Sequence, residues 1–191
     1  MRIKPIEKPQ GWMLRLAYAY SKKRLGRVIT PMKVVYARAP KSLGMMSRIA
    51  KFMEKGMRLK APLRLLLQTH TARINDCHFC VDIGRAIALR SHLDVSKLDA
   101  LERTIDDPVF TEAERAALAY VDEVTRNTRV SDETFERLRQ HYTDDEIVEI
   151  TLLNAVENFY NLVNRPLNIE SDELCALVPG LRPGKATPEA G

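Results

Sequence analysis

Residues 73–82 read Arg-Ile-Asn-Asp-Cys-His-Phe-Cys-Val-Asp and lie between two apolar stretches with helical spacing. Cys77 and Cys80 stand three positions apart, close to the start of the second stretch. Unpaired backbone N–H groups at a helix start favour a thiolate and lower the pKa of a cysteine there. Two thiols at this spacing can also close a disulfide after one of them is oxidised. The segment predicts thiol–disulfide chemistry at a helix start, with Asn75 or Asp76 as N-cap.

Helical periodicity continues toward the N-terminus of this segment. Pro62 suits the first turn of the helix that precedes the cysteines. Further helices are expected over 11–25 and 41–56, and residues 1–10, with two prolines, are expected to form an extended arm.

Capping signals mark the helices on the C-terminal side. Thr111 with Glu114 and Thr143 with Glu146 have the spacing of capping boxes, and Ser131 is an expected N-cap. The helices expected here cover about 77–90, 95–104 and 112–127, then one that follows Ser131 and buries Phe135 and Leu138, and a last one over 144–165 ended by Pro166. No segment alternates strand and helix, so the predicted fold class is all-α. From Pro179 onward the composition predicts a frayed tail.

The charge of the chain is divided between its two parts. Residues 1–60 carry 16 Lys or Arg and 2 acidic residues, whereas residues 61–191 carry 14 and 23. We expect the basic part to lie against acidic surfaces of its own chain or of a neighbouring subunit. A nucleic acid or a lipid surface is the alternative partner. Because no groove-reading motif accompanies the basic residues, we expect neither nucleic acid nor membrane binding.

Composition also indicates whether the chain can form a folded domain and in which cellular compartment it is expected. With 191 residues, 45% of them hydrophobic, the chain can bury a core. No apolar run approaches the roughly 18–20 residues of a membrane span, and the N-terminus does not resemble a secretory signal. Three cysteines do not suggest a secreted disulfide framework, so a cytoplasmic protein is expected.

Other chemistries find little support around the cysteine pair. A structural zinc site needs two further ligands, and neither a second cysteine pair nor a histidine cluster is present. Two inert, buried cysteines remain an alternative. Without a Gly-rich phosphate loop, no nucleotide is expected. No other cofactor and no metal are expected either.

The Arg-x-Asn-x-Cys-x-x-Cys pattern in an all-helical context resembles the carboxymuconolactone decarboxylase superfamily, and most closely its AhpD-like alkylhydroperoxidase branch. The resemblance is strong over about 60–105 and continues to the last helix, where Asn158, Asn161 and Asn164 are similar to the Asn-rich end of peroxidase-related members. It implies an AhpD-like helical bundle over 56–170, preceded by a basic helical arm at 1–55 and followed by a tail at 171–191.

The resemblance also implies roles. Cys80 would be the peroxidatic cysteine and Cys77 the resolving one, in a homotrimer or hexamer that reduces a small hydroperoxide and is reduced by a thiol protein or dithiol. The family places a Glu 12 residues before the first cysteine and a His four after the second. Here these positions hold Leu65 and Gly84, so the usual proton relay is missing.

Three residues are candidates to replace that relay. Asp82 and His78 lie near the cysteines in sequence, although a solvated first-turn acid and an exposed histidine are the plainer interpretations. Glu157 lies beside an apolar stripe, where burial would raise its pKa, unless it pairs with Arg73 or Arg165. It is the preferred substitute.

These observations favour an AhpD-like thiol peroxidase or disulfide reductase. A redox-sensing or scaffold protein of the same fold, and a carboxymuconolactone decarboxylase-like lyase, are the alternatives.

Overall fold

A computed structural model describes residues 1–178, which are helical and contain no strand. The order of elements is α1 (Trp12–Leu25), a π-helix (Met32–Tyr36), α2 (Ser42–Lys55), α3 (Ala61–Ile74), α4 (His78–Arg90), α5 (Ser96–Ala100), α6 (Glu112–Asn127), α7 (Asp132–Arg139), α8 (Asp144–Asn164) and two 3₁₀ turns (Arg165–Leu167, Leu174–Leu177). The predicted all-α class is confirmed.

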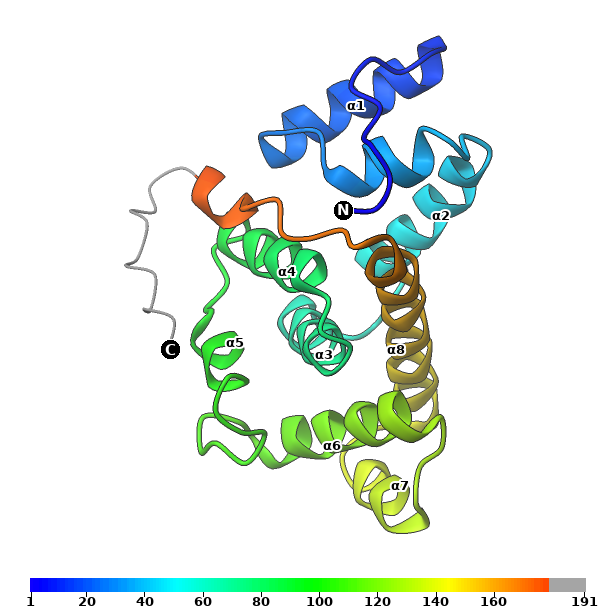
Figure 1. The fold of residues 1–191 in the computed structure, drawn as a ribbon. Helices are drawn as coiled ribbons and strands as arrows, with labels where there is room; N and C mark the ends of the chain where they lie inside the picture. The colour runs from blue at the N-terminus through cyan, green and yellow to red at the C-terminus, as the bar shows by residue number, and fades with distance from the viewer. Residues whose placement is uncertain (179–191) are drawn as a thin grey trace.

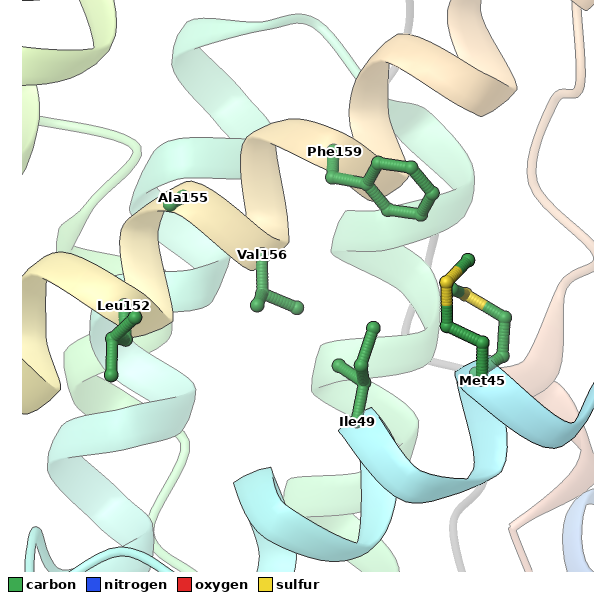
Figure 2. A pocket seen from close by; sticks show the side chains of 7 residues that line it. Met45, Ile49, Leu152, Ala155, Val156 and Phe159 are labelled. Atoms are coloured by element: carbon green, nitrogen blue, oxygen red, sulfur yellow. The ribbon is translucent and has the colours of Figure 1, made fainter. Parts of the chain in front are cut away.

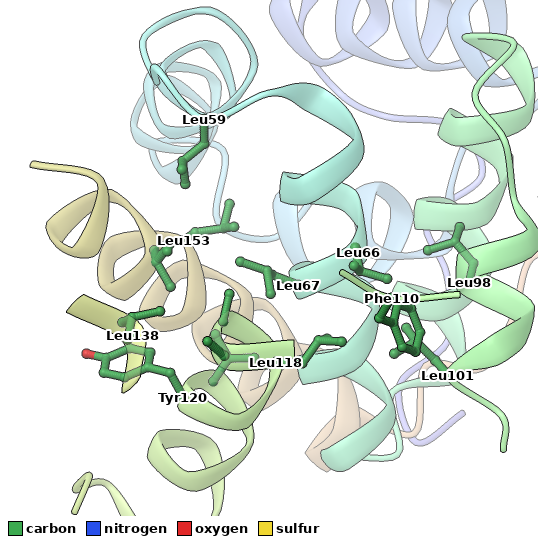
Figure 3. Close-up of a cluster of buried hydrophobic side chains, with 14 of the residues drawn as sticks. Leu59, Leu66, Leu67, Leu98, Leu101, Phe110, Leu118, Tyr120, Leu138 and Leu153 are labelled. Carbon is green, nitrogen blue, oxygen red and sulfur yellow. The ribbon is translucent and has the colours of Figure 1, made fainter. Parts of the chain in front are cut away.

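Helix α3 lies at the centre, and α4, α6 and α8 pack against it (Figure 1). Leu67 from α3, Leu118 from α6 and Leu153 from α8 are almost fully buried in one apolar cluster (Figure 3). Burying one such side chain stabilises the fold by about 1.5–3 kcal/mol. The packing fixes α8 against α3 and so positions the α8 side chains that face the cysteine pair.

The capping signals correctly placed the helices of the second half. Thr111 Oγ1 accepts from the Glu114 N–H at 3.2 Å, and the Thr111 N–H donates to the Glu114 carboxylate at 2.9 Å. Thr143 and Glu146 form the same reciprocal pair. Ser131 caps α7 through the N–H of Thr134.

The first ten residues have no regular helix, but they are attached to the rest of the chain. The Arg2 N–H donates to Leu167 O at 2.9 Å, and the Tyr18 hydroxyl donates to Ile6 O at 2.6 Å. Neither the π-helix nor the Leu174–Leu177 turn was predicted from the sequence. The frayed tail predicted from Pro179 lies outside the described residues.

Within residues 1–178, two ion pairs join the basic and acidic parts of the chain. Arg58 contacts Asp145, and Arg27 Nε lies 3.9 Å from Asp172. No helix among the described residues is long and apolar enough to cross a membrane.

Candidate functional site

The turn between α3 and α4 sets the position of the cysteine pair. The Cys77 N–H donates to Ala72 O at 2.8 Å, and the Asp76 N–H donates to Arg73 O at 2.9 Å, which are the two bonds of a Schellman motif. Asp76 adopts φ +52°, a left-handed conformation that Asp tolerates better than most residues. Cys77 itself is the N-cap of α4, so the prediction of Asn75 or Asp76 as N-cap was wrong.

Cys77 and Cys80 are joined as a disulfide, with Cα atoms 5.3 Å apart. This separation lies within the usual range for a disulfide. Cys77 is fully buried, while Cys80 keeps 7% of its surface exposed. Cys80 is therefore the more exposed residue of the pair. The third cysteine, Cys175, is free and half-buried.

The side chain of Asn164, at the end of α8, reaches this pair directly. Its Nδ2 donates to Cys80 Sγ at 3.4 Å, and both residues are buried. A buried amide donor pointing at a sulfur stabilises the thiolate form over the thiol, because the hydrogen bond to the charged form is the stronger one. The resemblance drew attention to Asn164, but no sequence pattern predicted its contact with Cys80.

A cluster of amides continues from Asn164 along the same face of α8. Asn75 Nδ2, in the turn, lies 2.8 Å from both Asn158 Oδ1 and Asn161 Oδ1. Asn161 Nδ2 in turn donates to Glu157 Oε1 at 2.8 Å. The cluster holds the cysteine turn against α8 through side-chain bonds that are partly shielded from water, which strengthens them.

Glu157 ends this cluster inside the protein. Burial raises the pKa of its carboxyl to about 7, although hydrogen bonds from Asn161 and Gln68 act in the opposite direction. The ion pair with Arg73 or Arg165 is absent. Arg73 instead lies 3.5 Å from Glu102, and Arg165 lies 2.7 Å from Asp76.

Glu157 does not touch either sulfur through any hydrogen bond of the described residues. Seven residues along a helix correspond to about 10 Å, which separates Glu157 from Asn164 by two turns. The carboxyl is connected to the cysteine turn through Asn161 and Asn75. Glu157 is thus placed to orient that turn, and proton exchange with Cys80 would need intervening water.

The other two relay candidates have different surroundings. His78 is exposed, and its Nε2 lies 2.9 Å from Asp76 Oδ1. The Asp82 carboxylate accepts from Ser171 Oγ and the Leu174 N–H, both at 2.9 Å, and from the Cys175 N–H at 3.2 Å. Asp82 therefore anchors the segment after α8 to α4, a role that sequence spacing did not indicate.

At the two positions of the missing relay, Leu65 and Gly84 lie where helices pack against each other. Leu65 packs against the main apolar cluster. A Cβ added to Gly84 would lie 3.0 Å from Thr69 Oγ1, which is buried and has no hydrogen-bond partner. A side chain at position 84 would therefore require the Thr69 side chain to shift by a few tenths of an ångström. Among the described residues, no group of three or more His, Cys, Asp or Glu side chains is arranged to hold a metal ion.

Comparison with known proteins finds a matching family and similar chains. Residues 43–123 match the model of the carboxymuconolactone decarboxylase family. The chain is 28% identical over 179 residues to the uncharacterized protein YnjA of Escherichia coli, covering 92% of this chain and 93% of that protein.

Solved structures share the fold, among them the following two. ATU0492 of Agrobacterium tumefaciens, a protein of unknown function described as a putative antioxidant defence protein AhpD, is 29% identical with a TM-score of 0.67, covering 72% of this chain and 96% of its own. The debrominase Bmp8, bound to 2,3,4-tribromopyrrole, superposes with a TM-score of 0.79 at 18% identity, covering 93% and 95%. At that identity the second likeness concerns the fold alone.

Proposed function

Since the chain belongs to the carboxymuconolactone decarboxylase superfamily, in its AhpD-like branch, we propose that it is a thiol-dependent peroxidase acting through Cys80 and Cys77. The observation that carries the proposal is the hydrogen bond from Asn164 Nδ2 to Cys80 Sγ, at the first turn of α4. The fold by itself does not select the reaction, because a debrominase shares it.

In the reduced protein, Cys80 is the attacking thiolate. Its sulfur attacks one peroxide oxygen, the O–O bond breaks, and the leaving alkoxide takes a proton and departs as an alcohol. Cys80 becomes a sulfenic acid. Asn164 stabilises the thiolate before attack, and the helix start adds its unpaired N–H groups.

The second step closes the disulfide. Cys77 loses its thiol proton and attacks the Cys80 sulfur, which expels hydroxide, and hydroxide and proton leave as water. An external dithiol, as a small molecule or a thiol protein, then returns two electrons and two protons to the pair. The Cα separation of 5.3 Å supports this step, since it lies within the range that a disulfide spans.

Glu157 is assigned a supporting part in this proposal. With a pKa raised by burial to about 7, it exchanges its proton near neutral pH. Through Asn161 and Asn75 it orients the cysteine turn, and through water it serves as proton reservoir for the leaving group. His78 and Asp82, with their own ionic and hydrogen-bond partners, are not assigned to the proton path.

Turnover distinguishes this enzyme from a redox sensor of the same fold. An organic hydroperoxide is supplied with excess dithiol, and its loss is followed for the wild type and for Cys80→Ser. The proposal expects many peroxides consumed per wild-type chain and none above background for the variant. Consumption that stops after one peroxide per chain would instead identify a sensor, and lactone decarboxylation without peroxide loss would identify a lyase.

A further inference from the structure

Helix α1 has an exposed apolar face. Trp12, Leu16 and Tyr20 follow one another at intervals of four residues and are 75%, 61% and 61% exposed, and Met13 beside them is 49% exposed. Residues four positions apart lie on one side of a helix, so these side chains gather on one face. We call these four residues the α1 face. Contiguous exposed apolar side chains of this kind mark an interaction site.

The opposite side of α1 attaches the helix to the rest of the chain. Leu14, Tyr18, Ser21 and Leu25 are buried. At the 100° per residue of an α-helix, the centre of this buried set lies roughly 155° from the centre of the α1 face. Figure 1 shows α1 at one edge of the molecule, at the opposite end from α6 and α7. The α1 face therefore points away from the protein interior.

Basic residues border the α1 face on both sides. On a helical projection, Arg15 and Lys22 lie along one border and Arg24 along the other, while Lys23 lies at the C-terminal end of the face. All four side chains are exposed. Among residues 1–178, Arg24 pairs with Glu54, whereas the other three have no acidic partner. Their charge is available to a partner.

The chain around α1 extends this positive charge. Residues 8–53 contain eleven Lys or Arg and no Asp or Glu. Of these eleven, three form ion pairs within the described part of the chain, namely Arg24, Arg27 and Lys33. Ion pairing inside residues 1–178 therefore leaves most of the basic side chains without an acidic partner. An unneutralised positive surface of this kind attracts an anionic partner.

The groove between α2 and α8 is apolar as well, but it differs from the α1 face in charge. Figure 2 shows Met45 and Ile49 extending from α2 toward α8, with Leu152 and Phe159 on the facing helix. None of the seven residues around its volume of about 290 Å³ is charged. Charge therefore selects no partner for the groove, whereas it selects an anionic one for the α1 face.

We propose that the α1 face binds the surface of a membrane that contains anionic phospholipids. In this contact α1 lies parallel to the bilayer without crossing it, and Met13 and Leu16 enter the boundary between headgroups and acyl chains. Trp12 and Tyr20 each carry a polar group on an apolar ring, which suits that boundary. The bordering basic residues then contact the lipid phosphates.

A lipid surface fits the α1 face better than a nucleic acid does. Phosphates of either partner would attract the basic residues, and aromatic rings can stack on bases. Met13 and Leu16, however, gain nothing from a phosphate backbone or from stacking, whereas a bilayer removes them from water. The basic residues alone predicted no membrane binding, and the exposed apolar face is the observation that changes this expectation. The contact uses no residue assigned to the peroxidase reaction and is independent of it.

Trp12 supplies a direct test, because it is the single tryptophan of the chain. Vesicles of phosphatidylcholine with phosphatidylserine are expected to shift its fluorescence to shorter wavelength. Vesicles of phosphatidylcholine alone should bind at least tenfold more weakly, and high salt should weaken binding to the anionic vesicles, since it screens the charges. An unchanged Trp12 emission with the anionic vesicles at low salt would overturn the proposal.

Leu16→Glu separates the α1 face from the other apolar surfaces. The variant should bind anionic vesicles at least tenfold more weakly and keep the wild-type circular dichroism, because Leu16 is exposed. Leu152→Glu, at an exposed apolar residue of the groove, makes the same change in charge and should bind like the wild type. Unaltered binding of correctly folded Leu16→Glu, or loss of binding in folded Leu152→Glu alone, would contradict the proposal.

A second variant keeps the proposal testable if Leu16→Glu misfolds. Lys22→Gln combined with Lys23→Gln retains the apolar residues and should also weaken binding to anionic vesicles, with little change for phosphatidylcholine alone. Two results would assign the α1 face to a different occupant and overturn the proposal. One is tighter binding of a DNA or RNA oligonucleotide than of the vesicles. The other is an oligomer without lipid in which Trp12 is shielded from a water-soluble quencher.

Discussion

Asn164 Nδ2 donates a hydrogen bond to Cys80 Sγ across 3.4 Å, joining the last turn of α8 to the first turn of α4. The bond brings together residues that lie 84 positions apart in the chain. It is the closest polar contact of the Cys80 sulfur among the described hydrogen bonds. The expected chemistry of the site depends on it.

Removing this donor should raise the pKa of the Cys80 thiol. Hydrogen bonds to charged groups contribute about 1.5–3 kcal/mol, and about 1.4 kcal/mol corresponds to one pKa unit, so Asn164→Ala should raise the pKa by one unit or more. The measurement is thiolate absorbance against pH in a Cys77→Ser background, where Cys80 is reduced. Asn158→Ala is the control, because Asn158 belongs to the amide cluster but does not contact the sulfur. Equal shifts in both variants would contradict a specific bond to Cys80.

Glu157 should make stability depend on pH. Its pKa is raised to about 7 in the fold, so the folded state binds the proton more tightly than the unfolded state does. This stabilising contribution is fully present below the unfolded pKa and is lost as pH rises through 7. The Glu157→Gln variant lacks this pH-dependent contribution. Between pH 5 and pH 8 the wild type should therefore lose about 2 kcal/mol more unfolding free energy than the variant, as measured by urea denaturation. Parallel pH profiles would show that the carboxyl is not buried as described.

The left-handed conformation of Asp76 should constrain substitution there. Asp76→Val places a β-branched residue at φ +52° and should cost about 1–2 kcal/mol of stability, whereas Asp76→Gly should cost less. The comparison by urea denaturation uses two variants that both lose the carboxylate and its contacts with His78 and Arg165. If the two variants were equally stable, the conformation of the Schellman turn would not matter.

Asp82→Asn should loosen the chain after α8 without changing the cysteine chemistry. The carboxylate accepts hydrogen bonds from Ser171, Leu174 and Cys175, and a neutral amide accepts them more weakly. Hydrogen exchange at residues 171–178 should become faster, while the rate of peroxide reaction stays as in the wild type. A slower peroxide reaction with unchanged exchange would instead return Asp82 to the proton path.

Local signals in the sequence predicted the helices well, because their causes are local. Thr111 with Glu114 needs only three residues of chain to form its capping box. The cysteine pair was equally visible, since its chemistry follows from spacing and from position at a helix start.

The surroundings of the cysteines depend instead on contacts between distant residues. Asp82 looks like a first-turn acid until the segment at 171–175 folds back onto it. The bond from Asn164 to Cys80 forms only because α8 packs beside the α3–α4 turn. The hydrophobic periodicity of a helix does not specify which turn it packs against. The sequence does contain one signal for this contact. Asparagine recurs on the buried face of α8, and a buried amide side chain needs a hydrogen-bond partner.

The most direct test of the central claim is to locate the oxidised sulfur in the Cys77→Ser variant. After one equivalent of hydroperoxide, the proposed function expects one added oxygen on the peptide that contains Cys80, as a trappable sulfenic acid, and an unmodified Cys175. The Cys80 rate should exceed that of an ordinary thiol at the same pH. Oxidation confined to Cys175, or reaction of Cys80 no faster than a free thiol, would contradict the assignment of Cys80 as the peroxidatic residue.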